Sequence, residues 1–193
     1  MFRNLGFTVV KGTRNLLVYQ QSRTSRPGPK SLISALDKPL NVLFQQKWTL
    51  LDGNIFKKSA DPPLSKYPGV YLLAYTVKPL KKEQVRMEDV FYVGMSTTAL
   101  RLRLRQFWDG IHDNGHHSGA MRFYRRWARN TSFANLKTDN CFYVVTLPIR
   151  CEPSKGLRTP ADLESMGSVA ALEYFALARI KRKIDLEPPL NRK

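Results

Sequence analysis

The stretch DVFYVGMSTTALRLRLRQFWDGI, residues 89–111, holds the two patterns that decide the fold. Its first part is a run of β-branched and aromatic residues, which predicts a strand that ends at Gly94. After Gly94 the apolar residues recur with helical spacing up to Ile111, and the Ser and Thr residues at 96–98 can cap a helix. The stretch therefore predicts a strand followed by an amphipathic helix.

Similar patterns on either side predict the other elements. Three apolar runs read as strands, and the first two form a hairpin with a long charged loop: 69–77, 89–94 and 140–149. Further helices are expected at 118–130 and from about Asp162 to Lys183. PLNVLFQQKWTLL suits a short helix or a strand, and the paired prolines of SADPPLSKYPG indicate a loop. The resulting order, strand, strand, helix, helix, strand, helix, predicts a single α/β (α+β) domain.

The amino-acid composition limits the kinds of molecule that the chain is expected to bind. The chain has 193 residues and a formal net charge of +17, so nucleic acid is the leading partner, with binding that weakens as salt rises. Solubility, or binding to acidic membranes, is the alternative use of such charge. No window approaches the roughly 20 apolar residues of a membrane-spanning helix. The two cysteines, Cys141 and Cys151, belong to no CxxC pair, so neither zinc nor a disulfide framework is expected.

The N-terminal segment has a different composition. Residues 1–36 are rich in Arg, Ser and Thr and contain no acidic residue, which is typical of a mitochondrial transit peptide. A basic, flexible arm that touches nucleic acid is the other reading, and the compartment is then the cytoplasm or nucleus. We expect three parts: this leader at 1–36, an extension at 37–66 and the main domain at 67–193.

Two charged residues interrupt apolar helix faces. In a helix at 162–183 the neighbours of Glu173 three, four and seven residues away are all apolar. Its carboxylate should therefore pair with an arginine, bind a metal or lie at the edge of the apolar stripe. Arg103 borders the stripe that contains Leu100 and Phe107, whereas Arg101 and Arg105 share a different face. Arg103 is therefore expected to have a role of its own, and the other two to contact phosphates or solvent.

Tyr71 in GVY and Tyr92 in YVG each lie in a predicted strand, and pairing of these strands could place both phenols on one face. Packing is the more common role of a single strand tyrosine. Five features of the chain occur in an order that resembles the GIY-YIG nuclease family. They are GVY, YVG, LRLR in a helix, a glutamate in a later apolar helix and the near-terminal PPLN. The resemblance covers roughly residues 67–193 and implies a three-stranded antiparallel sheet flanked by helices.

The resemblance implies a role for individual residues. Gly69 and Gly94 would be the family's glycines. The family's arginine follows the leading apolar residue of the helix by three positions, so Leu100 would make Arg103 that arginine. His117 with Ser118 is similar to the HS pair of some members, and a simple helix cap is its other reading. The implied catalytic residues are Tyr71, Tyr92, Arg103, His117, Glu173 and Asn191. Candidates for contacts with nucleic acid are Arg101, Arg105, Arg122, Arg125, Arg126 and Arg129.

The implied activity is hydrolysis of DNA phosphodiester bonds by a monomer or weak homodimer, with RNA left open as a substrate. Glu173 would hold Mg²⁺, or Mn²⁺, and Arg103 would neutralise charge on the phosphate. Tyr71 would orient and deprotonate the attacking water, with His117 as another proton acceptor. Phe107 and Met95 stand where many members carry a His or Tyr and a Lys. They favour the alternative of a non-catalytic nucleic-acid binder on the same fold.

Overall fold

The computed structural model describes residues 7–11, 17–21, 29–56, 66–76, 78–81, 84–113, 117–126 and 141–191. The chain forms two compact units, Met1–Ala35 and Leu36–Lys193, so the boundary lies beside the expected end of the leader. In the first unit, β1 (Phe7–Lys11) and β2 (Leu17–Gln21) pair as an antiparallel hairpin that the sequence did not predict. The leader or transit role of this segment stays a prediction.

The second unit has an α+β fold built on a four-stranded antiparallel sheet. Its strands are β3 (Thr49–Leu50), β4 (Gly69–Tyr75), β5 (Val90–Ser96) and β6 (Phe142–Pro148), in the order β3-β6-β4-β5. The expected sheet had three strands, and the fourth is β3, which pairs with β6. Two residues are too few to show an alternating pattern. At the other end of the sheet, β5 is the edge strand.

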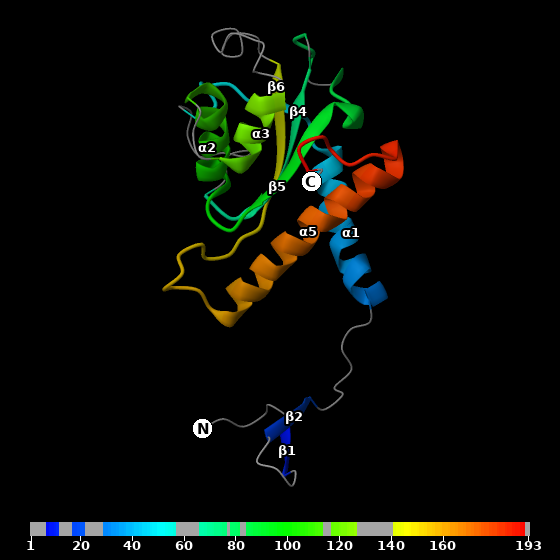
Figure 1. The fold of residues 1–193 in the computed structure, drawn as a ribbon, viewed down its shortest axis with the longest axis vertical. Coiled ribbons are helices and arrows are strands. Elements are labelled where there is room, and N and C mark those ends of the chain that lie inside the picture. Colours follow the sequence, from blue (N-terminus) through cyan, green and yellow to red (C-terminus); the bar gives the residue numbers. More distant parts are fainter. Residues whose placement is uncertain are drawn as a thin grey trace. The chain divides into compact units, whose positions relative to one another are not determined.

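Helices cover both faces of this sheet (Figure 1). In chain order they are α1 (Pro29–Gln45), α2 (Leu100–Asp113), α3 (Ser118–Arg126) and α5 (Pro160–Ile184). α2 and α3 pack on one face, whereas α5 and the part of α1 from Leu36 pack on the other. PLNVLFQQKWTLL thus contains both a helix end and the strand β3. None of the described helices is long and apolar enough to cross a bilayer.

Local signals explain where α5 begins and ends. The Thr159 hydroxyl accepts a hydrogen bond from the Asp162 backbone N–H, the Asp162 carboxylate accepts one from the Thr159 N–H in return, and Pro160 occupies the first turn. At the other end Asp185 takes the left-handed conformation, with φ of 56°. Between these ends α5 packs against β4 and the edge strand β5.

A bulge in the edge strand determines which side chains face α2 and α3. Leu73 pairs with Tyr92 but Ala74 pairs with Val90, so Phe91 is an extra residue. Phe91 and Tyr92 consequently both pack with the aromatic cluster under α2 and α3, while Val90 and Val93 pack under α5. The bulge thus places Phe91 on the same side of the sheet as Tyr92 and Tyr71, which share that face through the regular pairing between Gly69 and Leu73.

Candidate active site

Tyr71 and Tyr92 lie on one face of the sheet, as the sequence predicted. Tyr71 pairs with Gly94 across β4 and β5, and Leu73 pairs with Tyr92, which makes the two tyrosines diagonal neighbours. Their ring centroids are 6.0 Å apart, with the ring planes inclined at 56°. The two phenols therefore form one unit on the face that α2 and α3 cover.

Gly94 provides the space for both rings. A Cβ on Gly94 would lie 2.6 Å from Cζ and Oη of Tyr71 and 2.8 Å from Cε1 of Tyr92. Gly69 serves a similar purpose at the start of β4, because a Cβ there would collide with the carbonyl oxygen of Leu147 in the adjacent strand. Neither glycine has a positive φ, so close approach, and not backbone conformation, accounts for both.

The two phenols differ in access to solvent. Tyr71 is fully buried, and its hydroxyl lies beside the side chains of Arg103 and Tyr92. Burial, and then the neighbouring Tyr92, raise its pKa, although Arg103 acts in the opposite direction. Tyr92 is only partly buried, and its pKa is also raised, chiefly by burial, with Arg103 lowering it and Glu173 raising it.

This difference in burial bears on the expected role of Tyr71 as a base. A base that deprotonates water must reach that water, and the Tyr71 hydroxyl is enclosed by protein. Tyr92 is the more accessible of the two phenols. Tyr71 packs against its ring, and the role of Tyr71 as a base stays a prediction.

Arg103 is the cation that the other site residues share. It lies in the first turn of α2, where its backbone N–H donates to Ala99 O over 3.1 Å. Its positive charge lowers the pKa of Tyr71, Tyr92, His117 and Glu173. These four groups come from different elements, and their common neighbour confirms that Arg103 is set apart from the other arginines of α2.

His117 caps α3 with its side chain. Its Nδ1 accepts hydrogen bonds from the backbone N–H groups of Gly119 and Ala120 at 3.1 and 3.2 Å. An accepting Nδ1 requires that Nε2 carries the proton in the neutral ring. Burial and the Arg103 charge lower the pKa of His117 to about 4, so the ring is neutral at physiological pH.

The His117 ring is buried, and its Nε2 has no hydrogen-bond partner among the described residues. It packs edge-on against Tyr92, with ring centroids 6.5 Å apart. Since Nε2 already holds a proton, the expected role of His117 as a proton acceptor does not suit this geometry. The group is instead an N–H donor without a described partner beside Tyr92. The helix cap is observed, and the role of His117 as a site residue stays a prediction.

Glu173 reaches the site from the opposite side of the sheet. It lies in α5 at the edge of the buried stripe formed by Val169, Leu172 and Ala176, and it is itself only partly buried. Of the expected alternatives, the structure therefore shows a glutamate at the edge of the apolar stripe. Burial raises the pKa of Glu173, while the backbone N–H of Met95 and the charge of Arg103 lower it.

No described residue forms an ion pair with Glu173 within 4.0 Å. The salt bridge to an arginine that the sequence left open is thus absent from the described part of the chain. A partly buried carboxylate without a cation is costly, and such carboxylates are common at functional sites. The position beside Met95 places this carboxylate at the free edge of β5.

Asn191 closes that edge further along the strand. Its amide oxygen accepts from the Val93 N–H and its amide nitrogen donates to the Val93 carbonyl, both at 2.8 Å. The Leu190 N–H donates to the Phe91 carbonyl over 3.0 Å. Both polar groups of the Asn191 side chain are therefore used in pairing with β5. Asn191 holds the strand that carries Tyr92, and the catalytic role expected for it stays a prediction.

The arginines expected to bind nucleic acid divide into several groups. Arg101 donates to the Phe56 carbonyl over 2.6 Å, so it has a structural partner. Arg105 is exposed and lies 3.7 Å from Asp109. In α3, Arg122 donates to the Leu190 carbonyl, and Arg125 and Arg126 are exposed. Arg129 lies outside the described residues.

Two contacts at the site were not predicted. Phe107 is fully buried and stacks almost parallel to Tyr92, with ring centroids 6.5 Å apart. A Cβ on Gly119 would lie 3.2 Å from both Tyr92 Cζ and His117 Cε1. A glycine in the first turn of a helix, directly after a candidate cap, is the sequence signal that could have indicated this close contact.

The residues fit Mg²⁺ only as an ion shared with a substrate. No group of three or more His, Cys, Asp or Glu side chains in the described ranges could hold a metal ion alone. Glu173 offers one unpaired carboxylate beside an open strand edge, and Mg²⁺ commonly takes one or two carboxylates together with phosphate oxygens and waters.

No protein-family model, no curated protein and no solved structure matches this chain.

Proposed function

We propose that the chain is a GIY-YIG-type endonuclease that hydrolyses DNA phosphodiester bonds with the help of Mg²⁺ or Mn²⁺. One observation carries the proposal: the rings of Tyr71, Tyr92 and His117 pack together near Arg103, whose charge also acts on Glu173. Two phenols, a neutral imidazole, a carboxylate and a guanidinium suit the recognition of a phosphate and an attacking water. A packing role alone would not require all five groups in one place.

Each polar group has a distinct task in this proposal. Arg103 neutralises the charge that develops on the phosphoryl oxygens, and the His117 Nε2–H donates a hydrogen bond to one of them. Tyr92 orients the attacking water. Glu173 would hold the divalent ion, which supplies Lewis-acid polarisation of the phosphate. Tyr71 and Phe107 hold the Tyr92 ring from behind and from its face.

The charge of Glu173 also bears on the protonation of Tyr92. Glu173 raises the pKa of that phenol, and Arg103 lowers it. Neutralising the Glu173 charge would remove one of the causes that raise this pKa, while burial, the largest of them, would remain.

The charge of the whole chain favours a polyanion as substrate. Its net charge of +17 attracts nucleic acid over long range. In α3, whose first residues contact Tyr92, the last turn carries the exposed Arg125 and Arg126. These two arginines suit contacts with the phosphates that flank the scissile bond.

A second function, binding of nucleic acid without cleavage, is favoured by one observation. The pKa values of both tyrosines are raised, so neither phenol is a ready base in the absence of a cation. Phe107, packed between Tyr92 and His117, contributes no group that exchanges a proton. Such a protein would bind DNA through its arginines and leave it intact.

A nicking assay on supercoiled plasmid separates the two functions. The nuclease proposal expects nicked product with Mg²⁺ and none with EDTA, and it expects Arg103→Met to remove cleavage. Arg105→Met is the matched control, since Arg105 lies two residues further along α2, is exposed and pairs only with Asp109 among the described residues. Salt-sensitive binding with no cleavage in Mg²⁺ or Mn²⁺ selects the non-catalytic function.

A further inference from the structure

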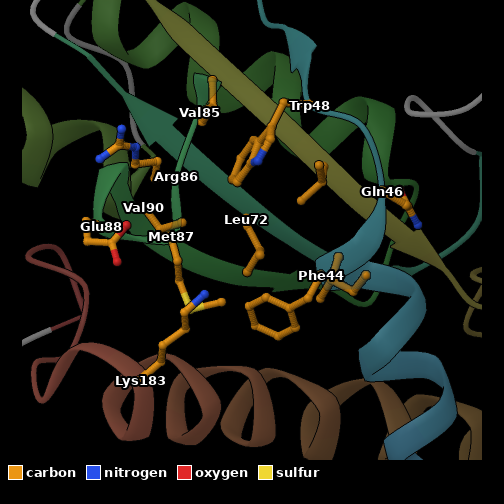
Figure 2. A pocket seen from close by; sticks show the side chains of 12 residues that line it. Phe44, Gln46, Trp48, Leu72, Val85, Arg86, Met87, Glu88, Val90 and Lys183 are labelled. Atoms are coloured by element: carbon orange, nitrogen blue, oxygen red, sulfur yellow. The ribbon is translucent and has the colours of Figure 1, made fainter. Parts of the chain in front are cut away.

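A cavity of about 420 Å³ lies under α5, on the face of the sheet opposite the tyrosines. Its floor consists of Leu72, Val90 and Val145 from three adjacent strands, all buried. Figure 2 shows Phe44 and Trp48 lining it from the end of α1 and the segment that follows. The volume is at the small end of the roughly 300–1,000 Å³ range of ligand pockets.

The charged groups at this cavity leave one positive charge in excess. Arg86 and Glu88 have opposite signs and both line it from the segment before β5. Lys183 is the third charged residue, and its side chain extends from α5 toward Met87 (Figure 2). Among the described residues Lys183 has no ion-pair partner, whereas Lys181 of the same helix pairs with Glu187 at 3.0 Å.

The hydrogen-bonding groups at this cavity also favour a ligand that carries a hydrogen-bond acceptor. The Trp48 indole N–H can only donate, and no described residue accepts a hydrogen bond from it. An ammonium group and an indole N–H are thus left free beside an apolar floor. A ligand with a flat apolar body and one anionic group would satisfy both the donors and the floor.

We propose that this cavity binds a small aromatic carboxylate, whose ring lies on Leu72, Val90 and Val145 and whose carboxylate pairs with Lys183. Trp48 stacks against the ring or donates to the carboxylate. The site is separate from the tyrosine site and does not rest on the proposed nuclease function. Binding can therefore be measured without reference to cleavage.

Isothermal titration calorimetry on the full chain tests the proposal with two probes of the same shape, 1-naphthaleneacetate and its neutral amide, 1-naphthaleneacetamide. We expect one saturable site that binds the carboxylate about tenfold more tightly or better, since a hydrogen bond to a charged group is stronger than a neutral one. Lys183→Met keeps the apolar stem of the side chain and should abolish the preference. Lys181→Met is the control and should retain it.

Tryptophan fluorescence gives a second measurement. The carboxylate should change the emission of the wild-type chain, and Trp48→Phe should remove that change while the other two tryptophans remain. Equal affinity for the two probes, an equal loss in Lys181→Met and Lys183→Met, or an unchanged fluorescence response in Trp48→Phe would each overturn the proposal.

Discussion

Gly94 and Tyr71 face each other across two strands with no room for another carbon atom, because a Cβ on Gly94 would lie 2.6 Å from the Tyr71 hydroxyl oxygen. The Tyr92 ring borders the same space. This relationship explains why a glycine ends the aromatic run of β5. It also makes the position of both phenols depend on a residue without functional groups.

Gly94→Ala should displace both rings and lower the free energy of unfolding by about 1–3 kcal/mol, as overpacking of a core does. Chemical denaturation measures this change. Gly167→Ala is the control, because an added Cβ there meets nothing within 4 Å and the residue lies inside α5. That variant should gain up to about 1 kcal/mol. A Gly94→Ala protein as stable as wild type would contradict the packing described.

His117 should make stability depend on pH. Its folded pKa of about 4 lies below the ordinary value of 6.5, so the unfolded chain binds more protons between these values. Stability is therefore present above pH 6.5 and is lost as pH falls toward 4, by up to about 3 kcal/mol. Asn at position 117 can still cap α3 but does not titrate.

Denaturation at several pH values compares the wild-type chain with His117→Asn. The variant should lose less stability than wild type between pH 6.5 and 4. Identical pH profiles would show that His117 titrates normally, and the assignment of its neutral form would be wrong.

Arg103→Met should raise the pKa of His117, because the Arg103 charge is one of the causes that keep it low. NMR titration of the imidazole protons measures the shift directly and needs no enzymatic activity. Arg105→Met should leave the value unchanged. If both variants give the wild-type pKa, Arg103 does not lie beside His117 and the site is not assembled as described.

Glu173→Gln should stabilise the chain at neutral pH. Burial raises the pKa of this carboxyl, so the folded state binds more protons than the unfolded state above the ordinary value of 4.5, and stability falls as pH rises through that region. Gln removes the unpaired charge and keeps an oxygen for the Met95 N–H. Glu164→Gln, on the same helix, should change stability by less than about 0.5 kcal/mol.

Denaturation at pH 7 decides this prediction. A Glu173→Gln protein less stable than wild type would indicate that Glu173 takes part in a stabilising ion pair. The carboxylate would then be structural, and the divalent-ion site would lose its only candidate ligand among the residues placed at the site.

Long, strongly patterned elements could be predicted from the sequence. The strand at 89–94, the helix that follows it and the pairing of the tyrosine strands are all present. β3 could not be predicted, since its two residues form a strand only because β6 offers a partner. The bulge at Phe91 was also hidden, because its effect depends on the register of the neighbouring strand.

Side-chain roles were harder to predict than elements. Helical spacing separated Arg103 from Arg101 and Arg105, and the Arg103 charge acts on Tyr92 and Glu173. Arg101 and Arg105, which were expected to act alike, have different partners. Helical spacing could not show that Tyr71 is enclosed by protein. Nor could it show that both polar groups of the Asn191 side chain form hydrogen bonds with the edge of β5. Those facts depend on residues far apart in the chain, which no local pattern records.

The rate of plasmid nicking by Glu173→Gln in Mg²⁺, relative to Glu164→Gln, tests the central claim most directly. The account predicts that Glu164→Gln cleaves at the wild-type rate and that Glu173→Gln, although folded and able to bind DNA, is slower by about 100-fold or more. Cleavage by Glu173→Gln at the wild-type rate would contradict it.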